Sequence, residues 1–204
     1  MKAELIEYYK RAYNDGLMKG TSGNASIIDR DNEIIIITPS SLDHSILSED
    51  DIVEIDMEGN VLKGEQKPSS EWRMHLEIYK KCKHANAILH SHSPFATAYA
   101  VMNKEIPFIL AEMGYWTDGA IPVSKFAKMG SLELGQNAAE TLMNRRTCLL
   151  QNHGVLAIGE NIKDAYLRAI YIEDAAQICC IANGMSDIQR YKYFPKQSIK
   201  TPTL

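Results

Sequence analysis

A run of four consecutive isoleucines, Ile34–Ile37, constrains the fold of this chain more than any other feature. β-branched residues favour extended backbone, and a short unbroken apolar run bounded by turn residues is typical of a buried strand. A second apolar stretch, Ala25–Ile28, precedes it, and the polar residues 29–32 between the two predict a turn. We therefore expect a hairpin here, and a second hairpin in which Ile52–Met57 and Asn60–Lys63 flank a Glu-Gly turn.

Helical patterns alternate with these hairpins. Residues 2–18 carry apolar side chains at helical spacing, and Pro68–Glu71 has the signals of a helix start, with serine as N-cap and the carboxylate in the first turn. This order favours an α/β fold with a mixed or antiparallel sheet covered by helices over a repeated βαβ unit. Further helices are expected to about residue 83 and at 94–102, 132–144 and 161–182, further strands at 87–92, 148–151 and 155–158, and an irregular or strand-like segment at 106–124.

Length and charge limit the class of protein. No repeat or linker divides the 204 residues, so we expect one domain over 1–204, with about 184–204 as a C-terminal arm. A net charge of −4 argues against a general nucleic-acid or membrane-surface binder, because both need a basic face. No apolar run predicts a membrane span or a signal peptide. Four cysteines without C-x-x-C spacing indicate reduced thiols and a cytoplasmic location.

Three histidines follow two apolar runs. His90 and His92 end the strand that begins at Ala87, and alternate residues of a strand share a face, so both side chains point the same way. His153 ends another apolar run and offers a third imidazole. Three histidines with an open fourth position are typical of a catalytic zinc site. A His-x-His pair is also compatible with half-buried polar residues, but two strand ends of the same form favour the metal.

Three polar loops offer neutral hydrogen-bond donors: residues 21–24, residues 38–41 and the helix start at Ser69–Ser70. Backbone N–H groups, hydroxyls and a helix dipole in such places bind anions. Turn and cap chemistry is the favoured explanation of any one loop, and only the three loops together point to an anion. Glu71, next to the helix start, is either a dipole-stabilised surface residue or a candidate acid/base and displaceable fourth metal ligand. His75 is interpreted as a packing residue or a second layer around the metal, and His44 and His84 as loop residues.

Five motifs together resemble a known family. They are Gly20-Thr21-Ser22-Gly23-Asn24-Ala25-Ser26, Ile37-Thr38-Pro39-Ser40-Ser41, Pro68-Ser69-Ser70-Glu71-Trp72, His90-Ser91-His92 and Gln151-Asn152-His153-Gly154. Their order and spacing over about residues 5–183 are similar to those of the class II aldolase/adducin family, and most of all to its L-fuculose-1-phosphate aldolases. The resemblance implies a three-layer αβα sandwich around a mainly antiparallel sheet. It also implies a homotetramer with four-fold symmetry and active sites at subunit interfaces.

The resemblance further implies a zinc-dependent aldolase that cleaves the C3–C4 bond of a ketose 1-phosphate into dihydroxyacetone phosphate and an aldehyde. It implies one Zn²⁺ per subunit held by His90, His92 and His153, with Glu71 as acid/base. Zinc as a Lewis acid would stabilise the enediolate, and the phosphate would anchor the substrate. The implied phosphate site consists of Thr21, Asn24, Ser40, Ser41, Ser69 and Ser70.

Two departures from the family pattern concern the aldehyde end of the substrate. A tyrosine that a neighbouring subunit supplies in fuculose aldolases falls near Ala111 here, so Glu112 and Tyr115 are accessory candidates. Tyr191 and Tyr193 are candidates for a C-terminal tyrosine. Epimerases of the family carry aspartate, and dehydratases cysteine, where Glu71 stands. Glu71 thus favours an aldolase, Glu112 keeps dehydratase or decarboxylase chemistry open, and the intact histidines argue against a metal-free adducin-like domain.

Overall fold

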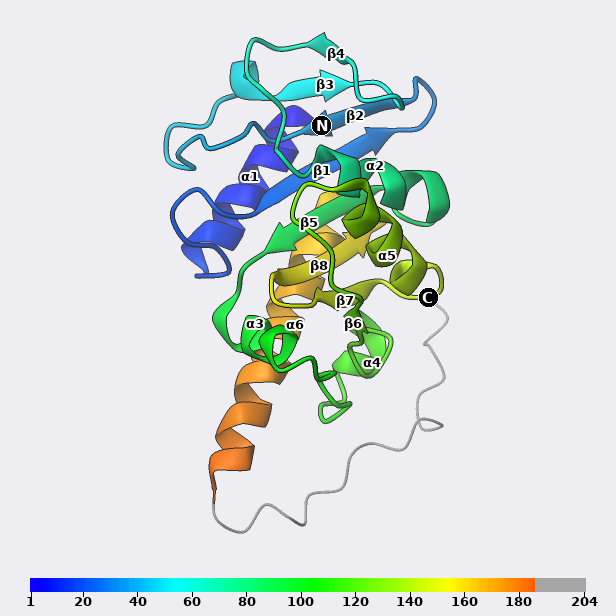
Figure 1. Cartoon of the computed structure of the whole chain (residues 1–204). Coiled ribbons are helices and arrows are strands. Elements are labelled where there is room, and N and C mark those ends of the chain that lie inside the picture. Colours follow the sequence, from blue (N-terminus) through cyan, green and yellow to red (C-terminus); the bar gives the residue numbers. More distant parts are fainter. Residues whose placement is uncertain (186–204) are drawn as a thin grey trace.

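An eight-stranded sheet forms the centre of the part of the molecule that the structure describes (Figure 1). The computed structural model describes residues 1–185. The strand order is β4-β3-β2-β1-β5-β8-β7-β6, and every neighbouring pair is antiparallel except β6 and β7. The strands are β1 Asn24–Asp29, β2 Ile34–Ile37, β3 Val53–Ile55, β4 Val61–Lys63, β5 Ala87–Ser91, β6 Val123–Ser124, β7 Thr147–Leu150 and β8 Gly154–Gly159.

Helices cover both faces of this sheet, which confirms the expected αβα layers and mainly antiparallel sheet (Figure 1). On one face, α2 and α5 pack together over a core that includes Ile35, Met74 and Leu142. On the other face, α1, α3 and α6 cover a core that includes Leu89 and Ile172. The helices are α1 Lys2–Asn14, α2 Trp72–Lys81, α3 Pro94–Val101, α4 Met113–Trp116, α5 Leu132–Leu142 and α6 Ile162–Gly184, with a short 3₁₀ helix η1 at Glu49–Asp51.

The two predicted hairpins are present. β1 pairs with β2 so that Ile27 lies opposite Ile36, and β3 pairs with β4. The irregular segment at 106–124 contains α4, β6 and an isolated bridge between Ile106 and Ile121. All four cysteines are free thiols, as expected. Within residues 1–185 no helix combines the length and the apolar character that a membrane crossing needs. Most of the expected C-terminal arm lies outside the described residues.

The start of α2 differs from the prediction. The helix begins at Trp72, with Glu71 at the N-cap position and no side-chain cap, rather than with a serine cap and Glu71 inside the first turn. Hydrogen bonds from distant parts of the chain explain the difference. The N–H of Ser69 donates to the Thr38 carbonyl at 3.0 Å, and the N–H of Ser40 donates to the Lys67 carbonyl at 2.9 Å. These bonds hold Ser69 and Ser70 outside the helix, so Glu71 stands at its very beginning.

Candidate active site and metal centre

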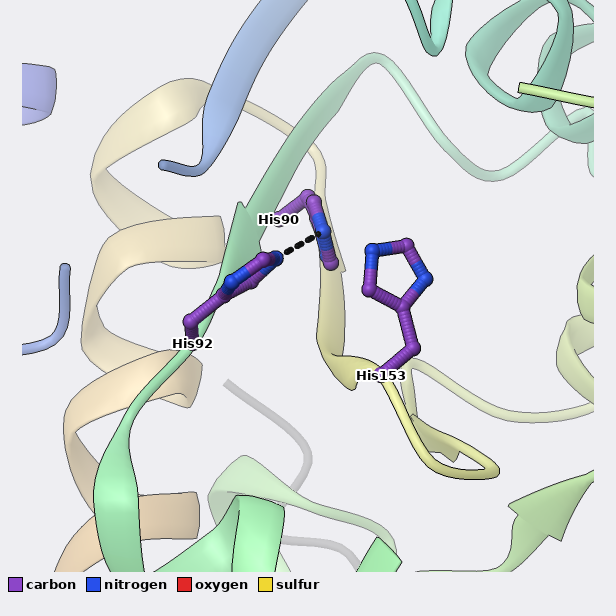
Figure 2. A group of neighbouring side chains, drawn as sticks. All are labelled: His90, His92 and His153. Carbon is purple, nitrogen blue, oxygen red and sulfur yellow. Dashed lines mark hydrogen bonds between the residues drawn. The ribbon is translucent and has the colours of Figure 1, made fainter. Parts of the chain in front are cut away.

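Three histidines converge at the centre of the sheet. β5 lies between β1 and β8, so His90, near its end, is opposite Asn24 on one side and Leu156 on the other. His92 follows β5 directly, and His153 lies in the turn between β7 and β8. Figure 2 shows the three rings facing one another; Nε2 of His90 and Nε2 of His92 are 2.9 Å apart, and one ring nitrogen of each histidine lies within 4.8 Å of the others.

A glycine permits this convergence. A Cβ at Gly154 would lie 2.4 Å from the Ser91 carbonyl oxygen, 2.9 Å from the His92 ring and 3.1 Å from the His90 ring. Because the nearest of these atoms belongs to the backbone of a central strand, no side chain fits there without moving β5 or β8. Gly154 therefore has a steric role in the site, and the search for chemically reactive residue types in the sequence did not assign it one. The signal available in the sequence was its position immediately after His153.

Glu71 completes the group. Its Oε2 lies 3.1 Å from Nε2 of His90 and accepts a 2.9 Å hydrogen bond from Nδ2 of Asn24, and its Oε1 lies 3.4 Å from Nε2 of His153. Burial alone would raise the pKa of Glu71, but the attraction and hydrogen bond of His90, the field of His153 and the Asn24 hydrogen bond outweigh it and lower the pKa. Glu71 is thus a buried carboxylate beside three imidazoles and not a surface residue.

The donor set fits a divalent cation. Nδ1 of His90 lies 2.9 Å from the Val155 carbonyl, which only accepts, so Nδ1 carries the proton and Nε2 faces the other histidines. Within residues 1–185, Nε2 of His153 and Oε1 of Glu71 are buried and have no hydrogen-bond partner, which is unusual for polar atoms. His90, His92 and His153 would therefore be the residues that hold a divalent cation here.

Two of the histidines are held in the form that binds metals. Burial, reinforced by the charges of the neighbouring histidines, lowers the pKa of His92 to about 3. Burial and the charge of His90 likewise lower the pKa of His153 to about 4. Both rings are therefore neutral near pH 7, and a neutral imidazole is the form that donates its lone pair to a metal.

The predicted phosphate-binding loops lie around Glu71. Asn24 and Ser69 are buried next to it: Asn24 donates to its carboxylate, and the hydroxyl of Ser69 accepts from its N–H at 3.3 Å. Ser40 and Ser41 lie on the 38–41 loop, which runs beside residues 67–69, with their hydroxyls 3.4 Å apart. The remaining two residues of the predicted set, Thr21 and Ser70, are exposed near these loops, and the carbonyl of Ser70 packs on Gly130.

The two accessory candidates, Glu112 and Tyr115, lie at the surface. Glu112 and Tyr115 are exposed at the start of α4 and within it, and in residues 1–185 neither forms a hydrogen bond or ion pair with Glu71 or the three histidines. The ring of Tyr115 instead contacts that of Trp116. Tyr191 and Tyr193 lie outside the described residues.

The other histidines take different places. His84 lies in a loop, as expected. His44 also lies in a turn, but it is buried, with its ring stacked against Tyr9 and Tyr13. His75 is completely buried and is hydrogen-bonded through both ring nitrogens. It is therefore not part of the converging ring-nitrogen group, and its partners connect it to Glu71 by way of Asn24.

Known proteins resemble this chain over most of its length. The family model for the Class II Aldolase and Adducin N-terminal domain matches residues 3–180. A 5-deoxy-D-ribulose 1-phosphate aldolase of Bacillus thuringiensis serovar kurstaki is 37% identical over 177 residues, or 87% of this chain and 83% of the relative. An L-fuculose phosphate aldolase of Methanococcus maripaludis is 35% identical over 182 residues, or 89% of this chain and 97% of the relative. The structure of an L-fuculose 1-phosphate aldolase superposes with a TM-score of 0.89 at 37% identity, covering 95% of this chain and 90% of that one.

Proposed function

Because the chain belongs to the class II aldolase and adducin family, we propose that it is a zinc-dependent aldolase. Its reaction is the cleavage of the C3–C4 bond of a ketose 1-phosphate, which yields dihydroxyacetone phosphate and an aldehyde. The observation that carries this proposal is the convergence of three imidazoles and one buried carboxylate beside loops of neutral hydrogen-bond donors.

The four converging side chains are assigned two tasks. His90, His92 and His153 hold the zinc, which when bound supplies Lewis acidity toward the carbonyl and the adjacent hydroxyl of the ketose. Glu71 takes up and returns the proton that bond cleavage moves, because it is a carboxylate held within 3.4 Å of two of those ligands. The hydrogen bond from Asn24 keeps Oε2 of Glu71 in place, while the other carboxylate oxygen accepts no hydrogen bond from residues 1–185.

The phosphate of the substrate is assigned to the surrounding loops. With a net charge of −4, attraction must come from local groups: hydroxyls, backbone N–H groups and the N-terminus of α2. Binding the phosphate there places the sugar carbons over the histidines. The proposed set is Thr21, Asn24, Ser40, Ser41, Ser69 and Ser70.

Removing two of these hydroxyls is expected to raise KM more than it lowers kcat. The phosphate is held equally in the ground state and the transition state. Losing these contacts therefore weakens substrate binding without slowing the chemical step. Ser69→Ala/Ser70→Ala should be compared with Ser45→Ala, which alters an exposed serine that hydrogen-bonds Asp43. Both constants should be measured with a ketose 1-phosphate and with the same sugar lacking phosphate. An unphosphorylated sugar cleaved as efficiently by the parent enzyme would contradict the phosphate site.

Product analysis tests the reaction itself. The names of the relatives indicate two sugar 1-phosphates as first substrates, L-fuculose 1-phosphate and 5-deoxy-D-ribulose 1-phosphate. We expect dihydroxyacetone phosphate from at least one of them, detected by coupled reduction. An isomerised sugar phosphate, or loss of water or carbon dioxide without C3–C4 cleavage, would instead indicate an epimerase, dehydratase or decarboxylase. No described contact favours these alternatives, since Glu112 makes no hydrogen bond or ion pair with the site within residues 1–185.

The active enzyme is proposed to be a cytoplasmic homotetramer with its sites at subunit interfaces. Beside the site, Phe126, Met129 and Leu132 are 60%, 61% and 49% exposed, and large apolar side chains grouped on a surface often mark an interface. This segment adjoins the site, because the N–H of Phe126 donates to the side chain of Gln151 and Gly130 packs on Ser70. Light scattering coupled to gel filtration should give a tetramer mass. A monomer that retains full activity would contradict the interfacial site.

A further inference from the structure

A buried ladder of side chains leads from the sheet to Glu71. On β1, Asn24 and Ser26 are two residues apart and share a face; on α2, His75 and Tyr79 are four residues apart and share a face. The two pairs interleave: His75 lies 2.6 Å from Asn24 and 2.6 Å from Ser26, and Tyr79 lies 2.7 Å from Ser26. All four side chains are at most 4% exposed, so bulk water does not compete for these contacts.

The carboxylate of Glu71, at one end of this ladder, determines which group donates in each of its hydrogen bonds. The carboxylate of Glu71 only accepts, so Asn24 turns its N–H group toward it and its Oδ1 toward His75. Oδ1 also only accepts, so Nε2 of His75 carries a proton. Burial lowers the pKa of His75 to about 3, so the ring is neutral and Nδ1 accepts from the hydroxyl of Ser26. Ser26 then accepts from the hydroxyl of Tyr79.

We propose that His75 is a positioning residue whose Nε2–H fixes the orientation of the Asn24 amide and thereby holds Glu71 in its place for proton transfer. Without this donor, Oδ1 of Asn24 would be buried without its partner, and the amide would be anchored by its bond to Glu71 alone. The amide and the carboxylate that it holds would then be less firmly placed. The same hydrogen bonds leave one N–H of Asn24 for the substrate phosphate. This inference rests on the function proposed for Glu71.

Two substitutions at His75 separate positioning from packing. His75→Leu removes both ring nitrogens, and we expect kcat to fall by about tenfold or more, with a smaller change in KM and unchanged metal content. His75→Gln restores an N–H group near the position of Nε2 and should recover most of kcat. Both variants leave Ser26 without its acceptor, so a purely structural role would lower stability and activity together in both. Tyr79→Phe, which removes only the far end of the ladder, should lower kcat less than His75→Leu.

These results can be separated from failure of the aldolase assignment. A parent enzyme that cleaves no ketose 1-phosphate contradicts the proposed function, whereas equal kcat in parent and His75→Leu, or no recovery in His75→Gln, contradicts the role of His75. The exposed His84→Leu serves as the control. A measurement independent of activity uses the parent protein with ¹⁵N-labelled histidine. Long-range proton–nitrogen spectra near pH 7 should show His75 as the neutral Nε2–H tautomer, and the Nδ1–H tautomer would overturn the proposal.

Discussion

Replacing Glu71 by glutamine is expected to lower kcat by about 100-fold or more while the fold and the bound metal are retained. The carboxamide has the same shape and its oxygen still accepts the hydrogen bond from Asn24, but it cannot take up and return a proton. Because only proton transfer is lost, KM for a ketose 1-phosphate should change much less than kcat. Steady-state kinetics with metal analysis of the same preparation measures both quantities.

Glu77→Gln provides the matched control. Glu77 lies six residues further along the chain, on the same helix, and is half-buried, so the same charge is removed without touching the histidines. Its activity should remain within about threefold of the parent, as is usual for a substitution away from the chemistry. If Glu71→Gln also retained near-parental kcat with a full complement of metal, the acid/base role of Glu71 would have to be abandoned.

The parts of the fold that sequence could predict are those set by local periodicity. The isoleucine run with the turn before it predicts the first hairpin, the Glu-Gly turn between two apolar stretches predicts the second, and the structure contains both. The beginning of α2 was mispredicted because it depends on hydrogen bonds between residues about 30 positions apart, from Ser69 to Thr38 and from Ser40 to Lys67. Local capping signals cannot outweigh two such bonds, since a single cap contributes only about 1 kcal/mol.

The residues of the site were likewise predictable only where local sequence pattern places them. Alternation along a strand was enough to place His90 and His92 together. The function of His75 could not be seen, because its partners are on β1 and become neighbours only when α2 packs on the sheet. A partial signal existed: Glu71, His75 and Tyr79 recur every fourth residue, a spacing that places polar groups on one side of a helix. Reading that spacing together with the alternate polar residues of β1 would have indicated a buried polar ladder.

Position and charge act together at Glu71. Standing at the N-cap of α2, the carboxylate lies at the positive end of the helix dipole as well as beside His90 and His153. Both effects favour its ionised form, which burial would otherwise disfavour. The long-range bonds that shift the helix start therefore also place a charged carboxylate within 3.4 Å of two of the three imidazoles.

Replacing His92 by alanine is expected to abolish stoichiometric metal binding and, with it, activity. His92 supplies one of three converging ring nitrogens. Without it, His90 and His153 form a three-ligand set only if Glu71 becomes a permanent ligand, which removes the carboxylate that the reaction needs. Since even indirect supporting residues of metal sites change affinity by about 10- to 100-fold, loss of a direct ligand should cost more. Metal analysis should show about one zinc per subunit in the parent and in the exposed control His84→Ala, and little in His92→Ala.

Removal of the metal from the parent should reproduce this phenotype. Dialysis against a chelator is expected to eliminate C3–C4 cleavage, and stoichiometric Zn²⁺ should restore it in the parent but not in His92→Ala. Circular dichroism establishes whether the variant is folded, which is expected because His92 follows β5 and is not one of its paired residues. A folded His92→Ala protein that binds one zinc per subunit as tightly as the parent would contradict the assignment of His92 as a metal ligand, and the three-histidine site would be wrong.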